Sequence, residues 1–384
     1  MRVIKVIATL AVAGIAILPA LLWLDHHRET NLPQPSGAFG VGRTVSVFSG
    51  QGRELPAWIW YPSEPSPPEH AAGEYLPAPW RKALEQKSGV LLSRFLTRDL
   101  SRVRAHAVRD AALSPQMPSW PVVFMRAGLA ALTTSYTALA EDLASHGYVV
   151  VGFDAPHRSF VVVLADGTVV TRARENDAGL LAGAAQEQLA TRLVQAWVAD
   201  LRFALDRLGE LDTNSKFRGR LDLKRVGVFG HSLGGAEALQ FCHDDSRCKA
   251  GIDLDGAPLG SVIADGVTQP FLFLLGDHQS EPDAETRPVQ ANIRSIYDRL
   301  PGDRRWLLTI RGASHYQFSD DGALLKSPLA RRVLRSLGLV RLDGRRQLEV
   351  TSHYLSAFFD VTLKGAPASQ LQARPEYPEV ETSH

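Results

Sequence analysis

The sequence predicts an α/β domain with a mostly parallel central sheet, helices on both faces of that sheet, and a transmembrane helix at the N-terminus. Short apolar runs of strand length alternate with segments of helical apolar spacing, which predicts the domain. An unbroken apolar run at residues 6–24 predicts the membrane helix. We therefore expect an N-terminal segment at 1–30, one catalytic-size domain at 31–366 and a polar C-terminal tail at 367–384.

The composition is that of an ordinary globular protein. The chain has 384 residues, of which 45% are hydrophobic and 22% are charged, and these values exclude a disordered, collagen-like or coiled-coil chain. Lys plus Arg total 42 against 41 for Asp plus Glu, which gives a net charge of +1. Because phosphate binding needs a basic surface, this balance argues against a nucleic-acid partner.

The N-terminal run has Thr9 as its only polar residue and carries no charge. At ~1.5 Å per residue it spans ~28 Å, about the thickness of a bilayer core. Arg2 and Lys5 precede it, which places the N-terminus in the cytosol and the domain outside, on the periplasmic or extracellular side. The run ends in Leu-Leu-Trp-Leu, without the small residues of a cleavage site. A retained membrane anchor is therefore expected; the alternatives are a cleaved signal with secretion, or a buried core helix.

Cys242 and Cys248 are the two cysteines of the chain. They lie six residues apart in a short polar link between a predicted helix and a predicted strand. In an exported protein they can close a small disulfide loop, and two unpaired thiols are the alternative. Two cysteines also exclude a zinc cluster of four thiolates.

The predicted elements follow one another as strand and helix. The stretch Leu-Pro-Gln-Pro-Ser-Gly at 32–37 is typical of a stiff linker. Asp166-Gly167 between β-branched residues predicts a small hairpin within 161–171. Apolar runs predict strands, and the 3.6-residue apolar period or a closing glycine predicts helices. The strands are expected at 121–125, 148–153, 225–229, 250–252, 270–275 and 305–310, and the helices at 134–146, at 186–208 and near the C-terminus around His353.

The motif Gly-His-Ser-Leu-Gly-Gly at 230–235 follows one of these strands and begins a helical stretch. A Gly-x-Ser-x-Gly motif on a strand-turn-helix is typical of a nucleophile elbow, where Gly230 and Gly234 leave room for the crowded backbone and the hydroxyl of Ser232 is exposed. The helix N-terminus supplies free N–H groups to a developing oxyanion. We predict that Ser232 is a nucleophile; a helix N-cap serine is the alternative.

A serine nucleophile needs a base, and the base needs an orienting acid. In hydrolases of this plan the chain order is Ser, acid, His. His315 follows the strand at 305–310, at the sheet edge where active sites of open α/β sheets lie, and is the predicted base. Asp255 ends the strand directly after the nucleophile helix and Asp277 ends the next strand. The residues alone leave both acids open. The other downstream histidines are His243, His278, His353 and His384.

Several motifs together resemble the plasma-type platelet-activating factor acetylhydrolases and their bacterial relatives, which belong to the α/β-hydrolase superfamily. The resemblance covers about residues 36–363. It implies an α/β-hydrolase fold, and hydrolysis of a short acyl chain from a phospholipid through an acyl-enzyme. It also implies that the acid comes early, at Asp255. The motifs are Gly-Ala-Phe-Gly-Val-Gly at 37–42, Trp-Tyr-Pro-Ser at 60–63, Leu-Ala-Ser-His-Gly-Tyr at 143–148, the stretch 217–260, and Gly-Ala-Ser-His-Tyr-Gln-Phe-Ser-Asp at 312–320.

The resemblance implies an oxyanion hole formed by the backbone N–H groups of Leu233 and Leu129. The loop that carries Leu129 departs from the family pattern. The family has His-Gly-Leu-Gly there, whereas this chain has Ala-Gly-Leu-Ala at 127–130, preceded by Arg126. The change bears on the shape of the loop and on the size of the acyl pocket; a plain turn glycine is the alternative for Gly128.

The sequence contains no phosphate-binding glycine loop, no dinucleotide fingerprint and no metal-spaced histidine pair, so no cofactor and no metal are expected. The expected partner is a small-molecule or phospholipid ester. A general carboxylesterase or polyester hydrolase with the same three residues is an alternative, as is a peptidase or acyltransferase. A catalytically inactive hydrolase fold that serves as a binding module is the alternative of another class, and the altered loop supports it.

Overall fold

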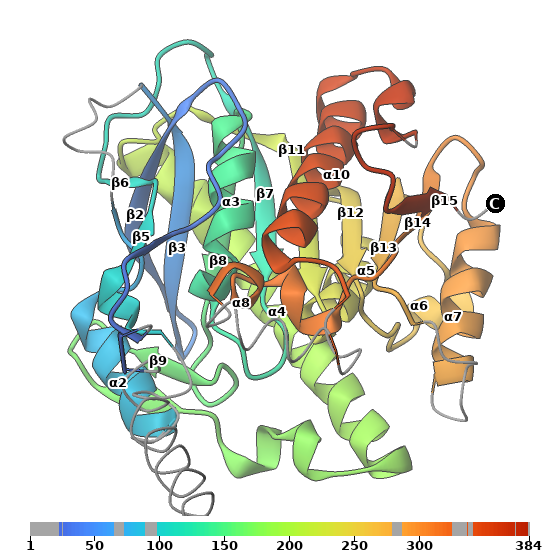
Figure 1. Cartoon of the computed structure of the whole chain (residues 1–384), viewed down its shortest axis with the longest axis horizontal. Helices are drawn as coiled ribbons and strands as arrows, with labels where there is room; N and C mark the ends of the chain where they lie inside the picture. The colour runs from blue at the N-terminus through green and yellow to red at the C-terminus, as the bar shows by residue number, and fades with distance from the viewer. Residues whose placement is uncertain are drawn as a thin grey trace, which may run out of the picture.

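The protein is described by a computed structural model, which covers residues 23–24, 26–64, 73–88, 98–278, 286–324, 336, 341–372 and 374–382. A ten-stranded mixed sheet runs through these residues (Figure 1). Its order is β15-β14-β13-β12-β11-β7-β8-β3-β2-β6. The strands are β2 (Gly40–Gly50), β3 (Arg53–Ser63), β6 (Val108–Arg109), β7 (Trp120–Arg126), β8 (Val149–Phe153), β11 (Leu221–His231), β12 (Cys248–Leu254), β13 (Phe271–Leu275), β14 (Arg305–Ile310) and β15 (Val380–Thr382).

The prediction of a mostly parallel sheet is correct for the centre and wrong for the edges. Strands β8, β7, β11, β12, β13 and β14 run parallel. At one edge β2 and β3 form an antiparallel hairpin, closed by Gln51 and Gly52 at positive φ. At the other edge β15, from the predicted C-terminal tail, pairs antiparallel with β14. Part of that tail therefore extends the sheet.

Helices cover both faces of the sheet, as predicted. Figure 1 shows α3 (Thr137–Ser145) and α10 (Gly344–Lys364) over one face. The opposite face is covered by α4 (Gly183–Asn214), α5 (Leu233–Asp244) and α7 (Thr286–Arg299). Because successive side chains of a strand point to opposite faces, each central strand contributes to two cores. Val123, Met125, Val150 and Leu272 belong to the first core, and Val122, Phe124, Val151 and Phe271 belong to the second.

The remaining elements are short. The predicted hairpin at 161–171 is present as β9 (Val161–Val163) and β10 (Val169–Thr171). Cys242 in α5 and Cys248 in β12 form a disulfide, with 5.0 Å between their Cα atoms. The other elements are β1 (Thr30–Asn31), β4 (Gly73–Glu74), β5 (Val103–Ala105), α2 (Ala78–Ser88), α6 (Val262–Asp265), α8 (Asp321–Leu324) and the 3-10 helices η3 (Leu100–Arg102), η4 (Thr133–Tyr136), η5 (Arg174–Asn176), η6 (Ala178–Leu180), η7 (His315–Phe318) and η8 (Ala368–Leu371).

The order of the strands reverses beside β7. From β7 the chain passes through α3 to β8 on one side, and then through α4 to β11 on the other side. The loops after β7 and β11 therefore leave the same sheet edge in different directions. In open α/β sheets such a switch point leaves a crevice at the carboxyl ends of the strands, where ligands bind.

Within the described ranges, the structure contains no helix that is both long enough and apolar enough to cross a membrane. The apolar run at 6–24, and with it the predicted transmembrane helix, lies outside the described residues apart from Trp23 and Leu24.

Candidate active site

Ser232 lies at a strained turn between β11 and α5. Its φ of 57° and ψ of −123° are rare for a residue with a side chain. A Cβ on Gly230 would lie 2.0 Å from the carbonyl oxygen of Gly234, and a Cβ on Gly234 would lie 2.5 Å from that of Arg126. Only glycine fits at either position, so the spacing of the motif follows from contacts with the backbone.

The structure brings together the three side chains that the sequence predicted for the site. His315 Nε2 lies 3.1 Å from Ser232 Oγ, and His315 Nδ1 lies 2.7 Å from Asp255 Oδ2. Each side chain follows a strand of the parallel centre: Ser232 follows β11, Asp255 follows β12 and His315 follows β14. The Asp255 carboxylate forces the imidazole proton onto Nδ1, so Nε2 is left to accept the serine hydroxyl.

Asp255 is held at both oxygens. Its Oδ1 accepts hydrogen bonds from the backbone N–H of Gly276 at 2.8 Å and from Nε2 of His278 at 2.7 Å. Burial alone would raise the pKa of Asp255, but the hydrogen bonds from His278 and His315 outweigh burial and lower the pKa well below its usual value. The carboxylate is therefore ionised at neutral pH.

His278 was not predicted as a site residue. It follows β13 and Asp277, and no sequence motif marks it. The hydrogen bond to Asp255 raises the pKa of His278, burial opposes that shift, and the charges of Asp255 and Asp277 add to it. Asp255 is thus hydrogen-bonded to two imidazoles, His278 at Oδ1 and His315 at Oδ2.

Asp277, the competing acid, does not contact His315. Its Oδ2 accepts the backbone N–H of Gly312 at 2.7 Å, and its own N–H donates to the carbonyl of Ala313 at 3.0 Å. Asp277 therefore holds the loop that carries His315, while Asp255 contacts the imidazole itself.

The predicted oxyanion residues also meet at this edge. Leu233 is the first residue of α5, so its N–H is among those that a helix leaves unbonded. Leu129 lies in the loop after β7, where Ala130 adopts a φ of 67°. A Cβ on Gly128 would lie 3.2 Å from Cβ of Ser232, so this loop packs against Ser232. The side chains of Leu129 and Leu233 pack against the same apolar cluster, formed by Ala178, Leu189 and Leu193.

Two buried contacts hold the altered loop. The N–H of Gly128 donates to the Tyr136 hydroxyl at 3.1 Å, and that hydroxyl bonds Nδ1 of His231 at 2.8 Å. Burial, with repulsion from His315, lowers the pKa of His231 to about 3, so this imidazole is neutral. Arg126 forms an ion pair of 2.8 Å with Glu237 of α5.

A second buried acid lies beneath the elbow. Asp253 is fully buried, and a Cβ on Gly235 would lie 1.8 Å from its Oδ1. Burial raises the pKa of Asp253 to about 8, although a hydrogen bond from the N–H of Gly256 opposes the shift. At neutral pH this carboxyl is largely protonated.

One group of possible metal-ligand atoms lies close together in the described residues. His26, His27 and Asp99 place one ligand atom each within 4.8 Å of one another, at the start of the domain. None of the three belongs to the loops that carry Ser232, Asp255 and His315.

Substitution of Asp253 tests its protonation. A carboxyl whose folded pKa is raised stabilises the protein most below its unfolded pKa of about 4, and this stability is lost as pH rises to the folded pKa of about 8. Asp253→Asn removes the ionisation. The difference in unfolding free energy between variant and wild type should therefore grow in favour of the variant, by about 1 kcal/mol per pH unit between pH 5 and 8. Urea unfolding at several pH values measures it, and a constant difference would contradict the protonated state.

Comparison with known proteins places this site in a family. Residues 24–178 and 204–366 match the family described as platelet-activating factor acetylhydrolase, isoform II. The chain is 25% identical over 339 residues to a platelet-activating factor acetylhydrolase of Canis lupus familiaris, covering 79% of this chain and 71% of that protein. It is 24% identical over 254 residues to a cutinase of Thermobifida fusca (strain YX), covering 65% and 71%.

A solved structure agrees with these matches. The ferulic acid esterase from Streptomyces cinnamoneus superposes with a TM-score of 0.72 and 27% identity, over 93% of this chain and all of that chain. The fold is thus a mixed-sheet α/β fold of the esterase kind, and the protein is a serine carboxylic ester hydrolase. Because the matched segments cover most of its length, the chain belongs to the platelet-activating factor acetylhydrolase isoform II family.

Proposed function

We propose that this enzyme releases a short acyl chain from a phospholipid or a similar ester, with Ser232 as nucleophile, His315 as base and Asp255 as orienting acid. The observation that carries the proposal is the continuous hydrogen-bonded chain from the Ser232 hydroxyl through His315 to Asp255. The early position of the acid, after β12, agrees with the pattern implied by the family resemblance.

In the first half-reaction Ser232 Oγ attacks the ester carbonyl while Nε2 of His315 takes its proton. The ionised Asp255 stabilises the resulting imidazolium. The tetrahedral oxyanion accepts hydrogen bonds from the backbone N–H groups of Leu233 and Leu129. Each such donor stabilises the transition state by about 3 kcal/mol where it has been measured. Protonation of the leaving alcohol by His315 then leaves an acyl-enzyme.

In the second half-reaction a water molecule replaces the alcohol. His315 removes one proton from the water, the oxygen attacks the acyl carbonyl, and Ser232 recovers its proton from the imidazolium. The products are a carboxylic acid and the free enzyme.

An apolar cluster lies beside the proposed oxyanion donors and offers an acyl group an apolar contact. The Leu129 and Leu233 side chains lie against Ala178, Leu189 and Leu193, next to the N–H groups that would bind the carbonyl. A relative in Arthroderma benhamiae (strain ATCC MYA-4681 / CBS 112371) is named a probable 1-alkyl-2-acetylglycerophosphocholine esterase. An acetyl-bearing phospholipid is therefore the preferred substrate class.

A polyester or general carboxylic ester is the second candidate. The similarity to cutinases and to the ferulic acid esterase favours it, because those enzymes are named for other esters. The same three residues would carry out the same two half-reactions.

The proposal extends to the placement of the enzyme. Residues 1–30 would act as a membrane anchor or signal, 31–366 as the catalytic domain outside the cytosol, and 367–384 as a tail. The Cys242–Cys248 disulfide supports an oxidising compartment, since disulfides are rare in cytosolic proteins. Secretion after cleavage is the alternative.

The central test is hydrolysis by wild type and by Ser232→Ala. We expect a fluorophosphonate probe to label wild type and not Ser232→Ala, and ester hydrolysis to fall by several orders of magnitude in the variant. A series of esters of rising acyl length, on phospholipid and on soluble alcohols, separates the two substrate classes. Folded wild type that neither reacts with the probe nor hydrolyses any ester would overturn the proposal in favour of an inactive binding module.

The two acids give a matched pair of variants. Asp255→Asn should lower kcat by about three to four orders of magnitude, because the amide favours the wrong tautomer of His315. Asp277→Asn keeps an acceptor for the N–H of Gly312 and should lower kcat less than tenfold. Steady-state kinetics on one soluble ester measures both, and the reverse ranking would reassign the acid.

We further propose that His278 is a positioning residue acting through Asp255. Its raised pKa makes it cationic on the acid side of neutrality, and a cation on the shared carboxylate disfavours protonation of His315. Among the described residues Asp277 also raises the pKa of His278 by its charge, and Asp277 lies 4.0 Å from Arg341. His278→Gln should therefore shift the acid limb of the pH profile of kcat/KM to higher pH, by up to about one unit.

His243→Gln is the control, because it alters an imidazole that is hydrogen-bonded to the carbonyl of Gly266. If the acid limb of kcat/KM in His278→Gln stays in place or moves to lower pH, His278 has a structural role only.

A further inference from the structure

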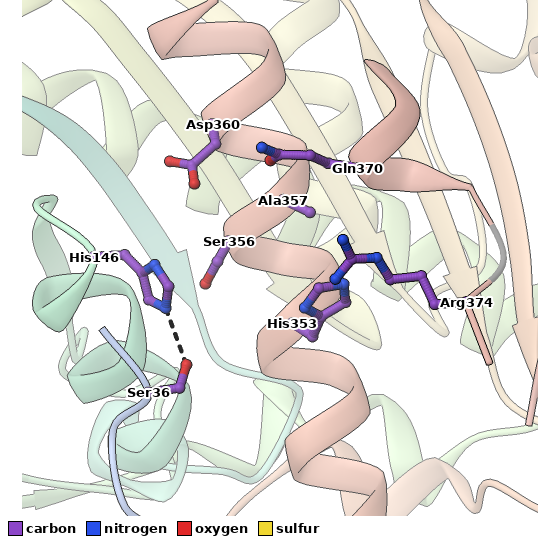
Figure 2. Close-up of a pocket in the computed structure, with 8 residues that line it drawn as sticks. All are labelled: Ser36, His146, His353, Ser356, Ala357, Asp360, Gln370 and Arg374. Carbon is purple, nitrogen blue, oxygen red and sulfur yellow. Dashed lines mark hydrogen bonds between the residues drawn. The ribbon is translucent and has the colours of Figure 1, made fainter. Parts of the chain in front are cut away.

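A second cavity, of about 220 Å³, lies between α3 and α10 and shares no lining residue with the triad. Figure 2 shows Ser36 and His146 on one wall, facing His353 and Ser356 of α10. Arg374, from the segment after η8, lines the cavity together with His353. The cavity therefore joins the linker before β2, the end of α3 and the C-terminal segment.

Three polar groups of this cavity have unused hydrogen-bonding capacity. His353 Nε2 is buried and has no hydrogen-bond partner in the described part of the chain. Across the same residues no hydrogen bond or ion pair engages the guanidinium of Arg374 or the side-chain amide of Gln370, which also lines the cavity. Of the three, His353 Nε2 is a buried atom, and a buried polar atom without a partner is costly. Arg374 is exposed and Gln370 is half-buried, so both can reach a species that enters the cavity from solvent.

Asp360, which lines the cavity, and Asp142 behind its wall are both hydrogen-bonded to other groups, whereas Glu376 also acts on His353 by its charge. Asp360 accepts the Tyr148 hydroxyl at 2.7 Å and pairs with Lys364 at 2.9 Å. Asp142 accepts the N–H and the hydroxyl of Ser36 at one oxygen, both at 2.8 Å, and the hydroxyl of Ser356 at the other, at 3.0 Å. The positive charge of Arg374 is thus left for a ligand.

The hydrogen bonds of Ser36, His146 and His353 determine which of their polar atoms are free. Because the Ser36 hydroxyl donates to Asp142, its oxygen accepts the Nε2–H of His146 at 2.9 Å. Burial, together with the charge of Arg374, lowers the pKa of His353, so this ring is neutral at pH 7 and can donate one N–H. One cation and two neutral donors, from Arg374, His353 and Gln370, line the cavity on the side of α10 and the C-terminal segment.

We propose that this cavity binds a small oxyanion, a carboxylate or a phosphate, on Arg374, His353 and Gln370. A guanidinium presents two parallel N–H groups, which match the paired oxygens of either ion. A volume of 220 Å³ is below the range of drug-sized ligand sites, so the ligand is a small ion and not a whole phospholipid. The site is independent of the ester-hydrolysing site and does not rest on its proposed substrate.

Calorimetric titration of the full chain with sodium phosphate and with sodium acetate, at ionic strength held constant with sodium chloride, tests the proposal. Saturable one-site binding of either ion is expected, and the two arms show which ion the site prefers. Arg374→Gln should weaken that binding at least tenfold. Gln370→Leu, which keeps the charge and removes one donor, should weaken it less.

Arg304→Gln is the matched control, because it removes one exposed arginine charge just before β14, outside the cavity. It should leave the affinity unchanged, and Arg374→Gln should retain wild-type ester hydrolysis and an unchanged circular dichroism spectrum. Absence of binding to wild type, equal affinity in Arg374→Gln, or an equal loss in Arg304→Gln would overturn the site without affecting the assignment of Ser232.

Discussion

The backbone conformation of Ser232 is the constraint on which the site depends. A positive φ at a residue with a side chain is unfavourable, and it persists where the surroundings over-determine it. Here β11 ends one residue before the serine and α5 begins one residue after it. Gly230, Gly234 and Gly235 each lack room for a Cβ, so strand and helix pack together at the turn. The strain exposes the hydroxyl and directs the first N–H groups of α5 to the same place.

Asp255, the proposed acid, is also held in an unusual backbone conformation. Asp255 also has a positive φ, of 55°, directly after β12, and its N–H donates to the carbonyl of Leu274 in the neighbouring strand. Its two oxygens accept three hydrogen bonds, from His315, Gly276 and His278. A carboxylate held at both oxygens cannot rotate freely. It can therefore orient His315 although that imidazole lies on a loop with an exposed surface.

The parts of the structure that were predictable from the sequence are those with a local signal. Continuous apolar runs predicted the central strands, and the spacing of Gly230, Ser232 and Gly234 predicted the elbow. The outer strands were missed because β2 alternates buried and exposed residues within a polar stretch, and β15 is short and solvent-facing. The residues left Asp255 and Asp277 open, since the choice is made by a tertiary contact. The hydrogen bond from His278 to Asp255 is also a tertiary contact, and no sequence pattern near His278 indicates it.

The altered loop at 126–130 shows how a changed motif can keep a geometry. Where the family has a second glycine, Ala130 adopts the left-handed conformation itself, at a cost of about 1 kcal/mol. That cost is tolerable because the loop is held on both sides: Arg126 pairs with Glu237 of the nucleophile helix, and Gly128 is bonded to Tyr136. Both contacts connect the loop to the turn at Ser232. Glu237 belongs to α5, and the Tyr136 hydroxyl is also hydrogen-bonded to His231, the residue before Ser232. The departure from the family motif was the one argument for an inactive fold, and in the structure other contacts hold the loop, with Gly128 against Ser232.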